Sequence, residues 1–263
     1  MRRPRAVSGR PSPITPSEDA MTLLAHPPSP PIEPIPASPG RPAAQVPFAP
    51  TAPLDMERPA VFGMLLTAVA GFLDVAAYVT FSHLYVSFMS GNSIHLGMSL
   101  ATLGTADILT IFGVVIAFVF GASAGTLLQD HASVRLLPLT LAIEAGLLLL
   151  AAAASSVTLS TISLLPVAIA MGLQDVLHQM SGTTSVGKGF VSGALVRLGQ
   201  SIARLRSPKA DPAATATLLA GWTAFVAGAA AGALAIARLG FIPCLLLAAA
   251  ALIALLIGDL SSR

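Results

Sequence analysis

Six long apolar runs dominate the chain from Ala60 onward, and each is close to the roughly 20 helical residues that cross a bilayer. They cover residues 60–81, 106–128, 136–154, 158–180, 213–237 and 239–258. Hydrophobic residues make up 54% of the 263 residues and charged residues only 10%, whereas roughly a quarter of the residues of a soluble domain are charged. The sequence therefore predicts an all-α integral membrane protein, a polytopic helix bundle with six full spans.

Two further stretches, residues 85–103 and 183–203, have spanning length but are interrupted by polar residues and glycine. The first carries Ser90, Gly91, Asn92 and His95, and the second carries Ser192, Gly193 and Arg197. Interrupted helices occur in membranes where the backbone lines a cavity or is buried in protein. We therefore expect two broken or re-entrant segments, with an eight-span bundle as the alternative.

The chain is similar to itself at an offset of about one hundred residues. Gly71 matches Gly172, Asp74 matches Asp175, and Ser90-Gly91 matches Ser192-Gly193, at offsets of 101 to 102. The glycine motifs Gly121-Xaa3-Gly125 and Gly228-Xaa3-Gly232 match at an offset of 107. These matches predict an internal duplication with repeats at 60–154 and 158–258, inverted if there are six spans and parallel if there are eight.

Basic residues in the short connections favour the cytoplasmic side of a membrane. With six spans and a cytoplasmic amino terminus, Arg238 lies outside and seven basic residues lie inside. The seven are Arg58, Arg135, Lys188, Arg204, Arg206, Lys209 and Arg263. With eight spans, Arg135 and Lys188 move outside and the ratio falls to five to three. Six spans are therefore preferred, and both arrangements place both termini in the cytoplasm.

Residues 1–59 hold 16 of the 21 prolines and show no helical period. Such a segment cannot bury enough apolar surface to offset its ordering entropy. We expect a disordered cytoplasmic tail, and its start does not have the pattern of a signal peptide, because no apolar core follows Arg2 and Arg3.

Asp74 is the sharpest candidate for function, because an acid near the centre of a membrane helix costs about 2.5 to 3.5 kcal/mol on insertion scales. Tyr78, four residues later, shares its helix face. Asp74 is either a carboxylate that binds a proton, cation or polar substrate, or a buried acid that holds a facing segment by accepting hydrogen bonds. The nearest donors by sequence are the Ser90 hydroxyl, the Asn92 amide and unwound backbone N–H groups.

The second half offers a weaker polar stripe. Asp175, His178 and Gln179 lie on one helix face, next to Gln174, and either relay protons or sit solvated at the cytoplasmic interface. Glu144 is a lone acid of the third long run that serves either packing or a proton path.

The Ser-Gly segments predict hinges whose backbone groups become available as ligands. His95 and Arg197 occupy equivalent positions after them, and Arg197 either pairs with an acid or extends to the interface. The small-residue motifs at Gly121 and Gly228 indicate helix packing or a homodimer contact.

Several classes of function lack support in the residues. The chain has no nucleophile elbow, phosphate-binding loop, HExxH or dinucleotide fingerprint, so we expect no enzyme. The single cysteine, Cys244, and histidines without ligand spacing predict no metal site and no cofactor. The small net charge of +2 argues against nucleic acid as a partner.

At these residues the chain resembles the YoaK-like family, bacterial integral membrane proteins built around a domain of unknown function. The resemblance covers about residues 60–258 and rests on Ala70-Gly71 with Asp74, on Ser90-Gly91-Asn92 with Leu96-Gly97, and on Gly172-Leu173-Gln174-Asp175. The family usually has Thr-Gly-Asn where Ser90 begins the motif, Asn where this chain has Asp175, and an apolar residue at His95. The resemblance implies about six spans in a bacterial inner membrane and no established activity.

The duplication, the paired acids and the paired broken segments together favour a transporter of a small polar solute or ion. The binding candidates are Asp74, Tyr78, Ser90, Gly91, Asn92, His95, Gln174, Asp175, Ser192, Gly193 and Arg197. The alternative hypothesis is a membrane scaffold or assembly protein that does not transport and holds partners through its small-residue faces.

Overall fold

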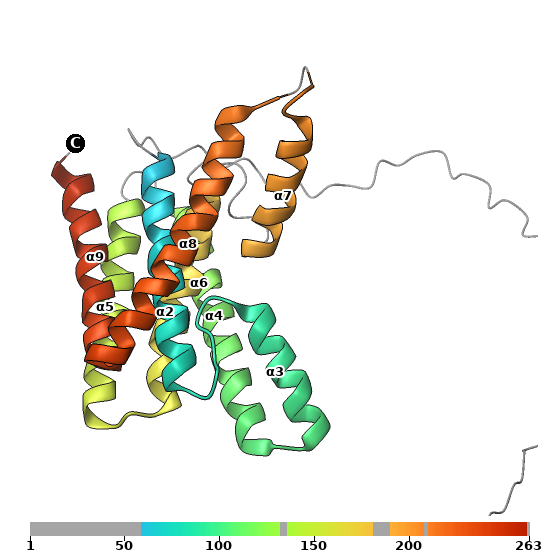
Figure 1. Ribbon diagram of the computed structural model, residues 1–263. Coiled ribbons are helices and arrows are strands. Elements are labelled where there is room, and N and C mark those ends of the chain that lie inside the picture. Colours follow the sequence, from blue (N-terminus) through green and yellow to red (C-terminus); the bar gives the residue numbers. More distant parts are fainter. Residues whose placement is uncertain (1–58, 132–135, 181–189, 208–209, 262–263) are drawn as a thin grey trace, which may run out of the picture. The chain divides into compact units, whose positions relative to one another are not determined.

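The computed structural model describes residues 59–131, 136–180, 190–207 and 210–261, without the side chains of residues 59–60, 178–180 and 190–191. These residues form eight α-helices and one short 3₁₀ helix, η1 (Figure 1). The elements are α2 (Pro59–Thr80), α3 (Met89–Thr102), α4 (Thr105–His131), α5 (Leu136–Val157), η1 (Thr161–Ser163), α6 (Leu164–Met180), α7 (Phe190–Arg204), α8 (Pro212–Leu239) and α9 (Phe241–Ser261). The predicted tail lies outside the described residues apart from Pro59.

Among the described helices, five are long and apolar enough to cross a membrane, namely α2, α4, α5, α8 and α9. They correspond to five of the six predicted spans, so the prediction of a polytopic helical bundle is confirmed. The remaining predicted span, residues 158–180, contains η1 and α6. With 17 residues, α6 is about 26 Å long, slightly shorter than a bilayer core of roughly 30 Å.

The two stretches predicted to be broken contain short, continuous helices. α3 has 14 residues and α7 has 15, too few for the roughly 20 that a span needs. The predicted hinges are wrong in their position: Ser90-Gly91-Asn92 and Ser192-Gly193 lie in the first turns of α3 and α7. Small polar residues are tolerated there because the first backbone N–H groups of a helix have no partner within it.

The irregular backbone lies before α3, at residues 81–88. Ser82 and His83 have φ angles of 46° and 68°, in the left-handed region, and they turn the chain back on itself after α2 ends. Asp74, six residues before the end of α2, contacts Val86 and Ser87, so the chain returns about 9 Å along α2. α3 therefore begins next to the segment that Asp74 holds, and it leads through Leu103 and Gly104 into α4.

Close backbone contacts join α2 to α8. A Cβ atom at Gly71 would collide with the backbone carbonyl of Phe225, and one at Gly228 with that of Ala68. Glycine allows the two helix backbones to approach without an intervening side chain. The α2–α8 pair is therefore fixed in register by residues that carry no side chain.

The α4–α6 pair makes the corresponding contacts. A Cβ atom at Gly172 would collide with the carbonyl of Phe118, and one at Gly121 with that of Ile169. Gly172 lies 101 residues after Gly71, and Gly228 lies 107 residues after Gly121. These glycine motifs therefore pack inside one chain, and they are not free surfaces for a homodimer.

α5 packs along α9, and α2 and α6 flank this pair. More than half of the apolar window of α2 and of α5 is buried, 56% each, against 33% for α9, 28% for α4 and 17% for α8. Most of the buried apolar residues belong to α2, α5, α6 and α9, and the largest of them include Leu66, Leu141, Leu148, Leu245 and Leu252. α4 and α8 pack on the outside of α6 and α2.

The six longer helices alternate in direction along the chain. α2 begins and α9 ends on the same side of the bundle, and α3 meets α4 on the opposite side (Figure 1). α7 meets α8 on the side where α9 ends (Figure 1). The two short helices therefore connect to their following helices on opposite sides.

Candidate functional site

Asp74 is a buried acid that accepts hydrogen bonds on both of its carboxyl oxygens. Its Oδ1 accepts hydrogen bonds from the backbone N–H of Val86 (2.8 Å) and of Ser87 (2.7 Å), and its Oδ2 accepts one from the Ser87 hydroxyl (2.6 Å). The side chain is only 3% exposed. A carboxyl group that leaves water needs hydrogen-bond donors, and these three donors tie Asp74 to the returning segment that it holds.

Asn92 holds the same segment from the side of α3. Its Nδ2 donates to the carbonyl of Tyr85 (2.8 Å), and its Oδ1 accepts from the N–H of Tyr85 (3.0 Å). The Tyr85 carbonyl and the Val86 N–H belong to one peptide unit, so Asn92 and Asp74 bind opposite sides of that unit. The structure thus brings the two predicted residues together through the backbone between them.

The predicted donors to Asp74 differ from the observed ones. Ser90 is exposed, and the Asn92 amide is used by Tyr85, so neither provides the hydrogen bonds that Asp74 accepts. Sequence reasoning missed Ser87, although a serine in the apolar run Leu84–Met89 is a signal that could have identified it. The unwound backbone N–H groups were expected, and they provide two of the three bonds.

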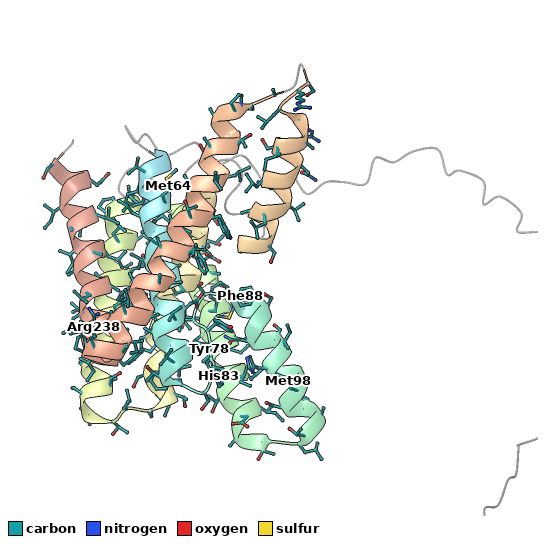
Figure 2. The ribbon with its side chains drawn as sticks, viewed as in Figure 1. Met64, Tyr78, His83, Phe88, Met98 and Arg238 are labelled. Carbon is teal, nitrogen blue, oxygen red and sulfur yellow. The ribbon has the colours of Figure 1, made fainter. Side chains whose placement is uncertain are left out.

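Aromatic rings cover this junction. Tyr78 contacts His83 and Tyr85, with ring centroids 4.6 and 5.1 Å apart, and Tyr85 contacts Phe88 at 5.2 Å. Figure 2 shows Tyr78, His83 and Phe88 near one another where α2 ends and α3 begins. A Cβ atom at Gly91 would lie 2.6 Å from the Phe88 ring, so the glycine leaves room for these rings. Partial burial, followed by the nearby Tyr78 and Asp74, raises the pKa of Tyr85, which keeps its phenol neutral.

Asp175 lies on α6, the helix that packs against both α2, which carries Asp74, and α5, which carries Glu144. The three acids come from α6, α2 and α5, which surround the core. Next to Asp175, Gln174 is 1% exposed and donates its Nε2 to the Leu66 carbonyl of α2 (2.9 Å), so it ties α6 to α2.

Glu144 is fully buried, with 0% of its side chain exposed. Neither of its oxygens has a hydrogen-bond partner within the described part of the chain, and the same is true of the Gln174 Oε1 atom. The predicted binding residues do not include Glu144, which the sequence assigns either to packing or to a proton path. Its position within an apolar run that lacks any other charge was the available signal.

The other predicted residues lie on the two short helices. His95 is half-exposed on α3; on α7, Ser192 is exposed, while Gly193 and Arg197 are half-exposed. The side chains of His178 and Gln179 lie outside the described residues. Among the described side chains, no three of the types His, Cys, Asp and Glu are grouped in a way that could hold a metal ion.

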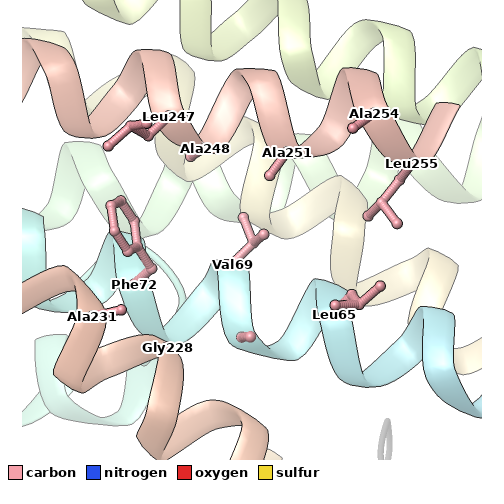
Figure 3. Close-up of a pocket in the computed structure, with 11 residues that line it drawn as sticks. Leu65, Val69, Phe72, Gly228, Ala231, Leu247, Ala248, Ala251, Ala254 and Leu255 are labelled. Carbon is pink, nitrogen blue, oxygen red and sulfur yellow. The ribbon is translucent and has the colours of Figure 1, made fainter. Parts of the chain in front are cut away.

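An apolar cavity of about 510 Å³ lies between α2, α8 and α9 (Figure 3). Leu65, Val69 and Phe72 of α2 line it together with Gly228 and Leu255 of the other two helices. None of the three acids lines this cavity. It suits an apolar chain and gives no site for a polar group.

Comparisons with known proteins agree with this architecture. The model of the DUF1275 family, described as proteins of unknown function, matches residues 62–258. The UPF0700 transmembrane protein YoaK of Bacillus subtilis (strain 168) is 26% identical over 145 residues, which make up 52% of this chain and 64% of that protein. The match therefore spans less than two thirds of the length of this relative, and no solved structure matches the chain. Together with the five candidate spans, these findings identify a multi-pass membrane protein.

Proposed function

This chain belongs to the DUF1275 family of proteins of unknown function, and we propose that it is a transporter of a small polar solute or ion in the bacterial cytoplasmic membrane. The observation that carries the proposal is the set of three acids Asp74, Asp175 and Glu144, which come from three helices that pack together around the core. Ionisable residues inside a membrane bundle are expensive and mark substrate, ion or proton pathways. Acids on three different helices of one core offer polar groups to a cation or a polar solute.

The helix contacts support two inverted repeats, residues 60–154 and 158–258, as the framework of the transporter. The α2–α8 and α4–α6 contacts use equivalent glycines at the sequence offsets of 101 and 107. α3 and α7 join their following helices on opposite sides of the bundle (Figure 1), as expected of repeats of opposite orientation. In this arrangement α6 also crosses the membrane, which makes six spans in all, and the segments that contain α3 and α7 are re-entrant.

The orientation follows from the basic residues. The side where α9 ends also carries the α7–α8 connection, with Arg204 and Arg206, whereas Arg238 lies near the opposite end of α8. Basic residues favour the cytoplasm, so both termini and the tail are assigned to that side. Reporter fusions after Arg263, within 204–212 and within 129–135 should all report cytoplasmic.

The scaffold hypothesis has less support than transport. It relied on small-residue faces for partner binding, and these faces pack between helices of the same chain. We also propose no enzymatic activity, since the acids lack a neighbouring nucleophile motif.

Transport is tested with the full-length protein in liposomes on a solid-supported membrane, with a panel of polar metabolites and inorganic cations, with and without a pH gradient. We expect at least one compound to give a current in wild-type liposomes that is lost in Asp175→Asn. Protein-free liposomes are the control. A folded, correctly oriented wild-type protein that gives no current with any compound would favour the scaffold.

A further inference from the structure

We propose that Glu144 is a proton-binding site in the interior of the bundle and that the proton it holds is the coupling ion. The second half of this statement rests on the transport function proposed above. The first half, the bound proton, concerns the protein whether or not it transports.

The position of Glu144 is deep in the membrane helix. It lies eight residues after Leu136, the first residue of α5, which is about 12 Å along a helix that rises 1.5 Å per residue. Leu141 and Leu148, three residues before and four residues after it, share its helix face and are also fully buried. Water therefore does not reach the carboxyl group in this conformation.

Among the described residues, no basic side chain lies on an element that packs against α5 and could neutralise a charge at this position. The elements that pack against α5 are α4, η1, α6 and α9, and none of them contains lysine or arginine. Their titratable residues are Asp107, Asp130 and His131 of α4, Asp175 and His178 of α6, and Cys244 and Asp259 of α9. Asp175 lies on α6, which packs against α5, and a second carboxyl group supplies no positive charge for Glu144.

An ionised carboxylate without a partner is among the most expensive groups to bury, whereas a proton removes the charge. A metal ion needs several ligands, and no suitable group of three exists among the described side chains. A proton needs only the one carboxyl group. Glu144 therefore holds a proton in this conformation, and release of the proton requires Glu144 to meet water or a cation in another one.

Packing does not require an acid at this position. Pro138 of α5 and Pro243 of α9 match at an offset of 105, which aligns Glu144 with Ala249. Ala249 is 1% exposed, so an alanine fills the equivalent buried position in α9. The buried position occupied by Glu144 in α5 therefore does not need an acid for packing, because its equivalent in α9 packs with an alanine.

The bound proton can be observed directly by infrared spectroscopy. Glu144 is the only glutamate after Glu57, because the others are Glu18, Glu33 and Glu57. The full-length protein is prepared with ¹³C-labelled glutamate carboxyl groups and reconstituted into lipid at pH 7. Ordinary glutamates have a pKa of about 4.3 and are ionised at this pH, so a protonated glutamate C=O band reports a shielded site.

In the wild type we expect a band of a protonated carboxyl group that shifts when glutamate carries the ¹³C label. This band should be absent from Glu144→Gln. Glu144→Asp, which has no label at this position, should show a protonated-carboxyl band at a different frequency. Absence of the band from the folded wild-type protein would overturn the proposal without recourse to any variant. If transport is found, Glu144→Gln should lose its dependence on the pH gradient. A band without transport would refute only the proposed function, and pH-driven transport without a band would refute only the proton site.

Discussion

Two buried acids of this protein, Asp74 and Glu144, have opposite surroundings. Asp74 accepts three hydrogen bonds from the segment between α2 and α3. Glu144 is equally removed from solvent, yet its oxygens have no partner among the described residues. Both carry the cost of an acid in a membrane, but only Asp74 recovers it through local bonds.

The hydrogen bonds of the two acids distinguish a structural role from a binding role more clearly than their positions in the sequence do. A carboxylate that fastens a returning segment is needed to fold that segment, so its removal should damage stability first. Glu144 makes no hydrogen bond to the described residues, so we expect its carboxyl group to contribute little to stability. A role in binding explains its presence better. The comparison therefore predicts that substitutions at the two sites separate stability from activity.

The largest effect is expected for Asp74→Ala. The N–H groups of Val86 and Ser87 and the Ser87 hydroxyl lose their acceptor, at about 1 to 3 kcal/mol each, so the free energy of unfolding should fall by about 3 kcal/mol or more. Unfolding in an SDS titration measures the change. Asp130→Ala, at an exposed position of α4, is the control and should leave the titration unchanged. Coincident curves for Asp74→Ala and wild type would remove the structural half of the comparison.

Asn92→Ala should have the next largest effect. It leaves the N–H and the carbonyl of Tyr85 without their partners, which corresponds to about 2 to 3 kcal/mol. The matched control is Ser93→Ala, because the Ser93 hydroxyl bonds only to Met89 of its own helix and is exposed. The same SDS titration applies, and equal losses for the two variants would show that Asn92 does not hold the segment.

Ser87→Ala should cost less, about 1 to 2 kcal/mol, because both backbone donors to Asp74 remain. The double variant Asp74→Ala with Ser87→Ala should be no less stable than Asp74→Ala alone, since the hydroxyl already lacks its acceptor. A double-mutant cycle measures this coupling. Additive losses would mean that the Ser87 hydroxyl stabilises the protein through another contact.

Much of the architecture could be predicted from the sequence, because long apolar runs and the spacing of glycines determine the architecture. The membrane helices, the pairing of Asp74 with the returning segment and the short elements after α2 and α6 follow from local composition. The position of the irregular backbone was not predictable in the same way. Ser90-Gly91-Asn92 looks like a break in the sequence, yet it begins a helix, because Asn92 bonds the chain that precedes it. Glu144 was underestimated for a related reason: only the packing of α5 against α6 and α9 shows that its carboxyl group has no partner among the described residues.

The smallest effect on stability is expected for Glu144→Leu, and it tests the other half of the comparison. Leucine has a similar volume and removes a buried polar group that recovers no hydrogen bond within the described residues. The free energy of unfolding should therefore stay within about 1 kcal/mol of wild type or rise, because the variant no longer buries a polar group without a hydrogen bond. Leu148→Ala, on the same face and fully buried, is the control that shows the assay detects packing here, with an expected loss of about 2 to 5 kcal/mol. A loss for Glu144→Leu as large as that for Asp74→Ala would mean that Glu144 stabilises the fold through a partner. The two acids would then differ only in which segment they hold, and the assignment of Glu144 to proton binding would have to be abandoned.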